Sequence, residues 1–207
     1  MHVTPVESQA VAARVLVADR VHVVGGPGVG KSLFAERIAA ATVLELHHLD
    51  ETAFEGPEFA LRPAEVTSHA ARVFAAEPRW VAEGIFVDWV APLFDRADVI
   101  VWLNYPALLI AYRLARRFVG KRAQPKSAGT SVEQKPTDAA APAAESASWS
   151  RRLARIGRTV RERREYRQWL GEAAQRGTMV IELGNPAAAE TWLGALASAT
   201  GPDSGAG

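Results

Sequence analysis

Residues 25–32 form a glycine-rich segment that ends in a lysine and a serine, and they fit the pattern G-x-x-x-x-G-K-[ST]. Its members, with the residue that follows, are Gly25, Gly26, Pro27, Gly28, Val29, Gly30, Lys31, Ser32 and Leu33. Glycines let the backbone curl so that successive N–H groups point into one concavity that holds phosphate oxygens. Lys31 adds a positive charge for the β- and γ-phosphates, and the Ser32 hydroxyl can bind Mg²⁺. The segment predicts a site for the phosphates of a nucleotide.

The residues around this segment have the context that such a loop requires. The apolar residues 21–24 predict a strand that leads into the loop. Beyond the loop, Leu33, Phe34, Ile38 and Ala41 recur at helical spacing. A strand, a glycine loop and a helix in this order place the phosphate at a helix N-terminus.

Acidic residues follow two other predicted strands, and ligands of open α/β sheets lie beyond the carboxyl ends of the strands. Asp50 follows the strand predicted over 43–47. It either orients or deprotonates an acceptor hydroxyl, or helps to hold Mg²⁺ through water, or only caps a turn. Glu83 and Gly84 end the strand predicted over 79–84, and we predict that Glu83 binds Mg²⁺ through water, in preference to a purely structural carboxylate. His47 and His48 suggest a metal cluster with Asp50, but neighbouring strand residues point to opposite faces, so we reject that cluster.

The remaining pattern alternates helices and strands, which predicts an α/β fold. Residues 98–104 are almost continuously apolar, as is typical of a central parallel strand buried on both faces. A further strand is predicted over 178–183, and 53–62 is predicted to be a loop. Helices are predicted over 5–18, from Pro63 through Phe74, over 87–94, over 107–118, from Trp149 onward and over 186–196.

The composition predicts one domain over residues 1–207 in a soluble cytoplasmic protein. Apolar residues make up 48% and charged residues 23%, and no apolar run reaches the roughly 18 residues of a membrane span. The absence of cysteine excludes disulfides and cysteine-based nucleophiles or metal sites. Residues 121–148 contain Val132 as their single branched or aromatic apolar residue, so we expect a flexible low-complexity insertion. The tail, 200–207, is expected to be disordered.

Arginine is concentrated in two stretches that flank this insertion. Residues 113–122 and 151–167 hold 13 of the 24 basic residues. Two basic helices beside a flexible segment suit a lid that closes over polyphosphate, where Arg117, Arg161 and Arg164 would neutralise charge. A nucleic-acid-binding patch is the less favoured alternative, because a phosphate lid already accounts for the arginines. A solvated helix face must describe most of them in either case.

Five segments together resemble the small bacterial P-loop kinases related to adenylate kinase, and in particular the topology modulation protein group. They are VVGGPGVGKS, LHHLDE, RWVAEG, ADVIVWLNYP and the arginine-rich pair of helices. The resemblance implies a three-layer P-loop NTPase fold, with helices on both faces of a parallel five-stranded sheet in the order 2-3-1-4-5. It also implies ATP as phosphoryl donor with Mg²⁺, and an R-x-x-x-R pair in which Arg113 lies near the adenine and Arg117 near the phosphates.

The chain departs from this family at three places. Glu83 and Asn104 stand where relatives carry Asp, and the lid holds an insertion where relatives have a compact basic segment. The leading hypothesis is transfer of the ATP γ-phosphate to a small acceptor, such as a nucleoside, a nucleotide or another hydroxyl compound. The alternative is a nucleotide-binding regulatory protein or slow ATPase without kinase activity, which these departures favour.

Overall fold

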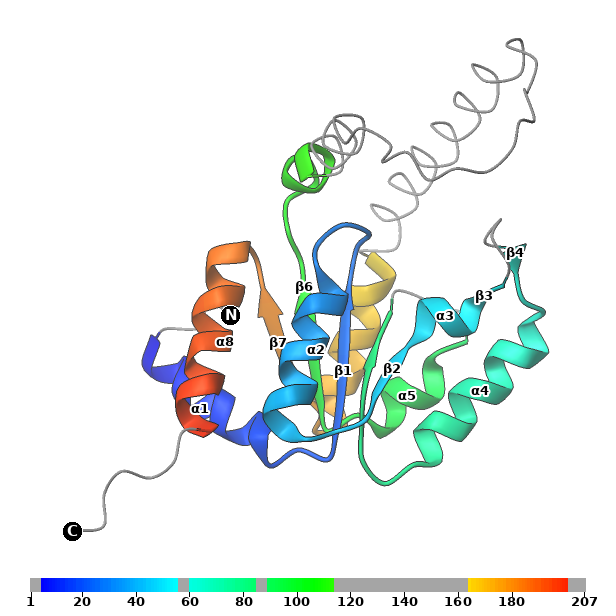
Figure 1. Ribbon diagram of the computed structural model, residues 1–207, viewed down its shortest axis with the longest axis horizontal. Helices are drawn as coiled ribbons and strands as arrows, with labels where there is room; N and C mark the ends of the chain where they lie inside the picture. The colour runs from blue at the N-terminus through cyan, green and yellow to red at the C-terminus, as the bar shows by residue number, and fades with distance from the viewer. Residues whose placement is uncertain (1–4, 56–59, 85–88, 114–163, 201–207) are drawn as a thin grey trace, which may run out of the picture.

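The computed structural model describes residues 5–55, 60–84, 89–113 and 164–200, and its centre is a parallel five-stranded sheet (Figure 1). The strands of this sheet, in spatial order, are β2 (Leu46–His48), β5 (Trp80–Glu83), β1 (Arg20–Gly25), β6 (Val99–Leu103) and β7 (Met179–Leu183). This is the predicted order 2-3-1-4-5 when the strands of the main sheet alone are counted. The predicted three-layer P-loop NTPase fold is confirmed.

The helices that the structure describes connect and cover these strands. They are α1 (Pro5–Leu16), α2 (Lys31–Thr42), α3 (Leu49–Ala53), α4 (Ala64–Ala76), α5 (Ala91–Arg96) and α8 (Pro186–Thr200). Residues 107–113 and 164–175 are helical as well. Among the described residues, no helix is long and apolar enough to cross a membrane.

Several local predictions differ from the structure, and the helix predicted over 87–94 is α5, which begins at Ala91 and ends at Arg96. The second strand was predicted over 43–47, but it starts at Leu46. Val43 has a left-handed backbone (φ 54°), and its N–H donates to the Ala39 carbonyl, so this residue ends α2 and does not begin the strand. The predicted loop 53–62 contains an antiparallel hairpin of β3 (Phe54–Glu55) and β4 (Ala60–Leu61). The helix α8 includes Thr200, which was assigned to the disordered tail. Both the insertion 121–148 and the rest of the tail lie outside the described residues.

The two faces of the sheet bury separate apolar clusters. On one face, Val21 and Val23 of β1 pack with side chains of α1, α2 and α8. On the other face, Val24 of β1 packs with α5 and the helix 164–175, whose Trp169 meets Phe94 edge to face at 5.4 Å. This alternation along β1 is the period of two that a strand buried on both faces must have. The helices therefore lie on both sides of the sheet, as Figure 1 shows.

The strands are fixed at their amino ends, which leaves the carboxyl ends for a site. The Arg20 backbone N–H and guanidinium both donate to the Asp98 carboxylate, at 2.9 to 3.2 Å. This contact clamps β1 to the residue that precedes β6. At the opposite ends of the strands, His48 and Glu83 are register partners, as are Gly25 and Leu103. Because the strands are parallel, these residues lie at the same end of the sheet, where the carboxyl ends of the strands meet.

Candidate functional site

The loop that joins β1 to α2 needs its glycines. Gly28 and Gly30 have left-handed backbones, with φ of 78° and 99°, which residues other than glycine rarely adopt. At Gly25, an added Cβ would lie 2.9 Å from the Leu103 carbonyl oxygen, so the loop passes too close to β6 for any side chain. The side chain of Val29, in the middle of the loop, is buried in the apolar core. The predicted phosphate loop therefore has a curled backbone seated directly on the sheet.

The first turn of α2 has no side chain of its own that would take the place of an anion. Its N-cap is Gly30, which offers no side-chain cap, and the first turn contains no acidic residue. Lys31, the first residue of the helix, is only 8% exposed, and within the described part of the chain no carboxylate pairs with it. A helix N-terminus and a lysine that lack acidic partners form an electropositive site suited to phosphate.

Glu83 lies beside this loop as a buried carboxylate with one oxygen unused. Its Oε1 accepts a hydrogen bond from the Ser32 hydroxyl at 3.0 Å and lies 2.9 Å from His48 Nδ1. Glu83 is 2% exposed, and its Oε2 is buried without a hydrogen-bond partner among the described residues. A buried oxygen in this state is costly unless water or a cation satisfies it.

This arrangement fits Mg²⁺, which prefers oxygen ligands and keeps several of its waters. The Ser32 hydroxyl donates its hydrogen to Glu83 and still has two lone pairs, so it can contact a cation at the same time. The Glu83 carboxylate beside this hydroxyl is the kind of group that accepts a hydrogen bond from a metal-bound water. The structure thus brings the two residues predicted as metal ligands together, and their binding of Mg²⁺ remains a prediction.

The neighbouring histidines point to opposite faces of β2, as the sequence analysis expected. His47 Nε2 lies 2.8 Å from Glu77 Oε2, and its ring stacks on Phe74 at 4.2 Å. His48 instead contacts Glu83, on the side of the phosphate loop. No pattern in the sequence predicts a role for His48 outside the rejected metal cluster.

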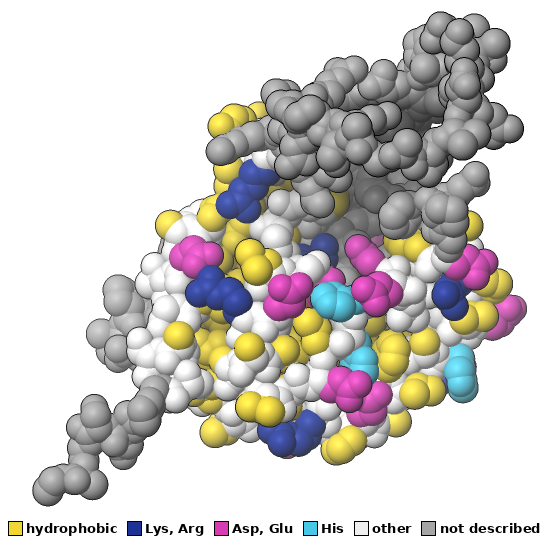
Figure 2. Space-filling view, viewed as in Figure 1, with side chains coloured by type: hydrophobic (Ala, Val, Ile, Leu, Met, Phe, Trp, Pro, Cys, Tyr) yellow, Lys and Arg dark blue, Asp and Glu magenta, His cyan; other side chains and the backbone are white. Residues whose placement is uncertain are grey.

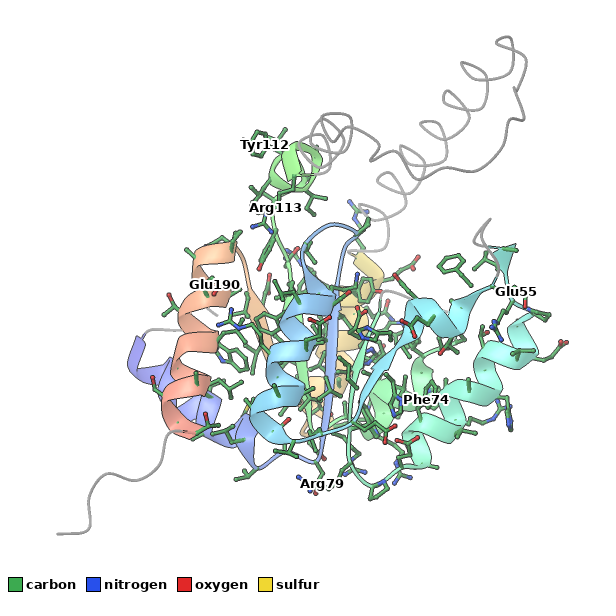
Figure 3. All side chains as sticks on the ribbon, viewed as in Figure 1. Glu55, Phe74, Arg79, Tyr112, Arg113 and Glu190 are labelled. Atoms are coloured by element: carbon green, nitrogen blue, oxygen red, sulfur yellow. The ribbon has the colours of Figure 1, made fainter. Side chains whose placement is uncertain are left out.

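Arg113 is the predicted lid residue that the structure places at the loop. It lies on the helix above the carboxyl ends of the strands (Figure 3), and its Nη1 donates to the Val29 carbonyl at 3.2 Å. Its guanidinium also lies over the Tyr105 ring, 5.6 Å from the centroid. Burial raises the pKa of the Tyr105 hydroxyl, and the nearby Arg113 charge opposes that rise. Arg113 therefore joins the helix 107–113 to the phosphate loop.

The other predicted site residues are placed less closely or not at all. Arg117 and Arg161 lie outside the described residues, and Arg164 is exposed at the start of the helix 164–175. Asp50 and Leu33 are exposed on the first turns of α3 and α2. Asn104 donates to Glu182 of β7 at 2.6 Å, so its amide is engaged at the far side of β6 from Glu83.

A pocket of about 380 Å³ lies between the end of β2, α3 and α4. Its lining combines apolar and ionisable side chains, namely Leu46, His47, His48, Glu51, Thr52, Arg62, Val66, Ala70 and Phe74. Figure 2 shows acidic and histidine side chains gathered near the centre of this face of the molecule. His48 contributes to both this pocket and the contact with Glu83. The described lining includes Glu51 and Thr52 but not Asp50, which the sequence analysis had selected.

Gly84 follows β5 and lies against Leu49 at the start of α3, so replacing it should disturb both the fold and the site. A Cβ at this position would lie 2.7 Å from the Leu49 Cβ, and Leu49 is fully buried. We expect Gly84→Ala to cost about 1–3 kcal/mol in the free energy of unfolding, because a packed core cannot absorb the added methyl group. The shift of Leu49 should also move His48 away from Glu83. Urea denaturation measures the stability.

Gly194→Ala in α8 is the matched control, since an added Cβ there has no heavy atom within 4 Å. Alanine is favoured over glycine in a helix by about 1 kcal/mol, so this variant should be slightly more stable than the parent. A Gly84→Ala variant with the parent's unfolding midpoint would show that the Leu49 contact is not tight.

The sheet order, the curled glycine loop and the uncapped helix behind it define this chain as a P-loop α/β protein. No protein-family model matches the sequence, and no curated protein sequence matches it either.

Comparison with solved structures finds kinases with weak overall similarity. A gluconokinase from Sinorhizobium meliloti 1021 aligns over 86% of this chain and 91% of its own, with 16% identity and a TM-score of 0.47. A shikimate kinase from Acinetobacter baumannii, solved with shikimate, aligns over 89% and 94%, with 15% identity and a TM-score of 0.46. A shikimate kinase from Bacteroides thetaiotaomicron aligns over 88% and 98%, with 14% identity and a TM-score of 0.43. The fold class rests on the topology of this chain itself.

Proposed function

We propose that this protein is a cytoplasmic ATP-dependent phosphotransferase that moves the γ-phosphate of ATP to a small-molecule acceptor. The observation that carries the proposal is the buried Glu83 carboxylate, which shares Ser32 with the phosphate loop and keeps Oε2 unpartnered. A loop that only bound phosphate would not need an acidic group beside its serine. A magnesium-bound nucleotide does need one, because the carboxylate holds a water of the metal.

The protein's own groups would act mainly by position and charge. The loop N–H groups and Lys31 would hold the β- and γ-phosphates, and Ser32 and Glu83 would hold Mg²⁺ directly and through water. Bound Mg²⁺ would supply charge neutralisation at the transferring phosphoryl group. Arg113 would lie on the nucleotide side of the loop, while Arg117, Arg161 and Arg164 of the lid would stabilise charge on the equatorial oxygens.

The pocket beside β2 would take the acceptor. Its volume suits a small molecule, and its lining includes one arginine, one glutamate and two histidines beside an apolar wall made by α4. Arg62 is already near Glu55, at 3.9 Å, so its charge is partly balanced. Asp50, on the same short helix as Glu51, would orient or deprotonate the acceptor hydroxyl.

A second candidate is a nucleotide-binding regulatory protein or slow ATPase. Asn104 favours it, because this position carries no charge and its amide nitrogen donates to Glu182. A protein that binds Mg·ATP without an acceptor-activating group would hydrolyse it slowly or only respond to it.

Incubation with Mg·ATP and a panel of acceptors distinguishes the two candidates. The panel should contain nucleosides, nucleotides, sugars and small hydroxy acids, with product masses measured directly. We expect one acceptor class to gain a single phosphoryl group while an equal amount of ADP forms, and only when Mg²⁺ is present. ADP formed without any phosphorylated acceptor would support the slow ATPase, and a bound nucleotide without ADP would support the regulatory protein.

A further inference from the structure

The carboxylate of Glu83 is held on one side by two donors from different elements. Ser32 reaches Oε1 from the first turn of α2, and His48 reaches the same oxygen from the end of β2. His48 is 29% exposed at its side chain, whereas the Glu83 side chain is 3% exposed. The carboxylate is thus buried between the phosphate loop and the pocket, with His48 on the pocket side.

The geometry fixes which hydrogen His48 provides. A carboxylate oxygen accepts hydrogen bonds, so the tautomer that stabilises this contact carries its hydrogen on Nδ1. With both donors on Oε1, the second oxygen, Oε2, has no partner among the described residues. Two donors on one oxygen fix the rotation of the carboxylate better than one, since a single hydrogen bond leaves the group free to turn about it.

The Ser32 hydroxyl alone is a weak restraint once a metal is bound. It then has to direct a lone pair to the cation and its hydrogen to Glu83, which limits its rotation to geometries that satisfy both. His48 has no such competing task. Side chains that orient metal-binding carboxylates commonly change metal affinity by about 10- to 100-fold when they are removed.

We propose that His48 is a positioning residue for magnesium. Through Nδ1 it fixes the Glu83 carboxylate beside the Ser32 hydroxyl, the group of the phosphate loop that would bind the metal. This inference rests on the proposed use of Mg·ATP but does not depend on which acceptor is used. It also explains why a polar side chain stands at the end of β2, directly in register with Glu83.

Magnesium-dependent binding of a non-hydrolysable ATP analogue tests this role without relying on turnover. The full-length protein is titrated by calorimetry at a series of Mg²⁺ concentrations. For His48→Ala we expect the Mg²⁺ concentration that supports half-maximal binding to rise about 10-fold or more. His48→Asn should recover most of the loss, because its Nδ2 is attached to Cγ as His Nδ1 is. His48→Gln should not, because its donor lies one bond further out.

Two comparisons separate this role from a general loss of structure. His69→Ala, which removes an exposed imidazole from α4, should keep the parent's dependence on Mg²⁺. In the acceptor assay, His48→Ala should raise the KM for Mg²⁺ more than it lowers kcat at saturating Mg²⁺, whereas general misfolding would lower kcat alone.

The outcomes distinguish the inference from the function on which it rests. An unchanged Mg²⁺ dependence in His48→Ala, or an equal loss in the Asn and Gln variants, would overturn the role of His48 while the phosphotransferase proposal stands. Mg²⁺-dependent analogue binding that follows the expected order, with no phosphorylated product from any acceptor, would support the role of His48 and refute phosphoryl transfer. A parent protein that binds no Mg·ATP would overturn both.

Discussion

Replacement of Lys31 by methionine should abolish most nucleotide binding while leaving the empty protein at least as stable as the parent. The affinity for Mg·ATP should fall about 10- to 100-fold, because a hydrogen bond to a charged group contributes about 1.5–3 kcal/mol. Turnover should fall by about 10²- to 10³-fold, because the lysine also neutralises charge that develops during transfer. Calorimetry with an ATP analogue and a product assay measure the two quantities.

The stability half of this prediction follows from burial. Lys31 is 8% exposed, and the described part of the chain provides no acidic partner for its ammonium group. The ammonium nitrogen is not among the fully buried polar atoms, so the packed part is the apolar stem, and methionine keeps most of that stem while it removes the charge. In the parent, Mg·ATP at about 100 times its Kd should add about 2.7 kcal/mol to the free energy of unfolding. The variant should lose most of that gain.

Arg37→Ala is the control on the same helix. Its guanidinium pairs with Glu190 at 2.7 Å, but both side chains are largely exposed, so the change should cost less than about 1 kcal/mol and leave nucleotide binding intact. A Lys31→Met protein that binds Mg·ATP as tightly as the parent would refute the assignment of the phosphate site. A Lys31→Met protein much less stable than the parent would show that the ammonium group has a structural partner.

The sheet and its order could be predicted because they depend on signals that lie along the chain. Residues 99–103 are apolar without interruption, and the structure buries every residue of β6. The glycine loop between a strand and a helix is equally local, and Gly30, which the pattern fixes, has a left-handed backbone in the structure. The hairpin β3–β4 and the helix α3 could not be predicted in this way. Each is too short to show a period, and α3 also packs against a residue distant in the sequence, Leu49 against Gly84.

The residues of the candidate site could be predicted only in part. Ser32 and Glu83 were identified because each stands at a fixed place in a motif, and the structure brings them within hydrogen-bonding distance. His48 was not, because its importance depends on the register of β2 with β5, which pairs it with Glu83. The predicted strand ended one residue too early for that pairing to be visible. A strand placed over 46–48 in the predicted order would have put an imidazole beside the carboxylate.

His22 is a second feature that the sequence analysis passed over, since one histidine within an apolar strand carries no signal. It is fully buried in β1, its ring lies 4.8 Å from Phe94, and neither ring nitrogen has a partner among the described residues. Burial lowers the pKa of His22 from 6.5 to about 3. The folded protein therefore keeps this imidazole neutral at a pH where the unfolded chain would protonate it.

This difference predicts a loss of stability in mild acid. Below the unfolded pKa, the unfolded chain binds a proton that the folded chain does not, so the free energy of unfolding falls as the pH falls towards the folded pKa. Between about pH 7.5 and about pH 5, His22 should cost about 2 kcal/mol. His22→Leu should remove this contribution, and at about pH 7.5 it should be no less stable than the parent, because it buries no unpartnered nitrogen.

Urea denaturation at both pH values measures the effect as a difference between parent and variant. The parent should lose about 2 kcal/mol more than His22→Leu on acidification, over any loss that the two share. His69→Leu, an exposed position on α4, should keep the parent's full pH dependence because it leaves His22 in place. Equal losses in the parent and in His22→Leu would mean that His22 is protonated within the fold or has found a partner. In that case the core between β1 and α5 would have to open to water, and the rigid sheet on which the phosphate loop is seated would be in doubt.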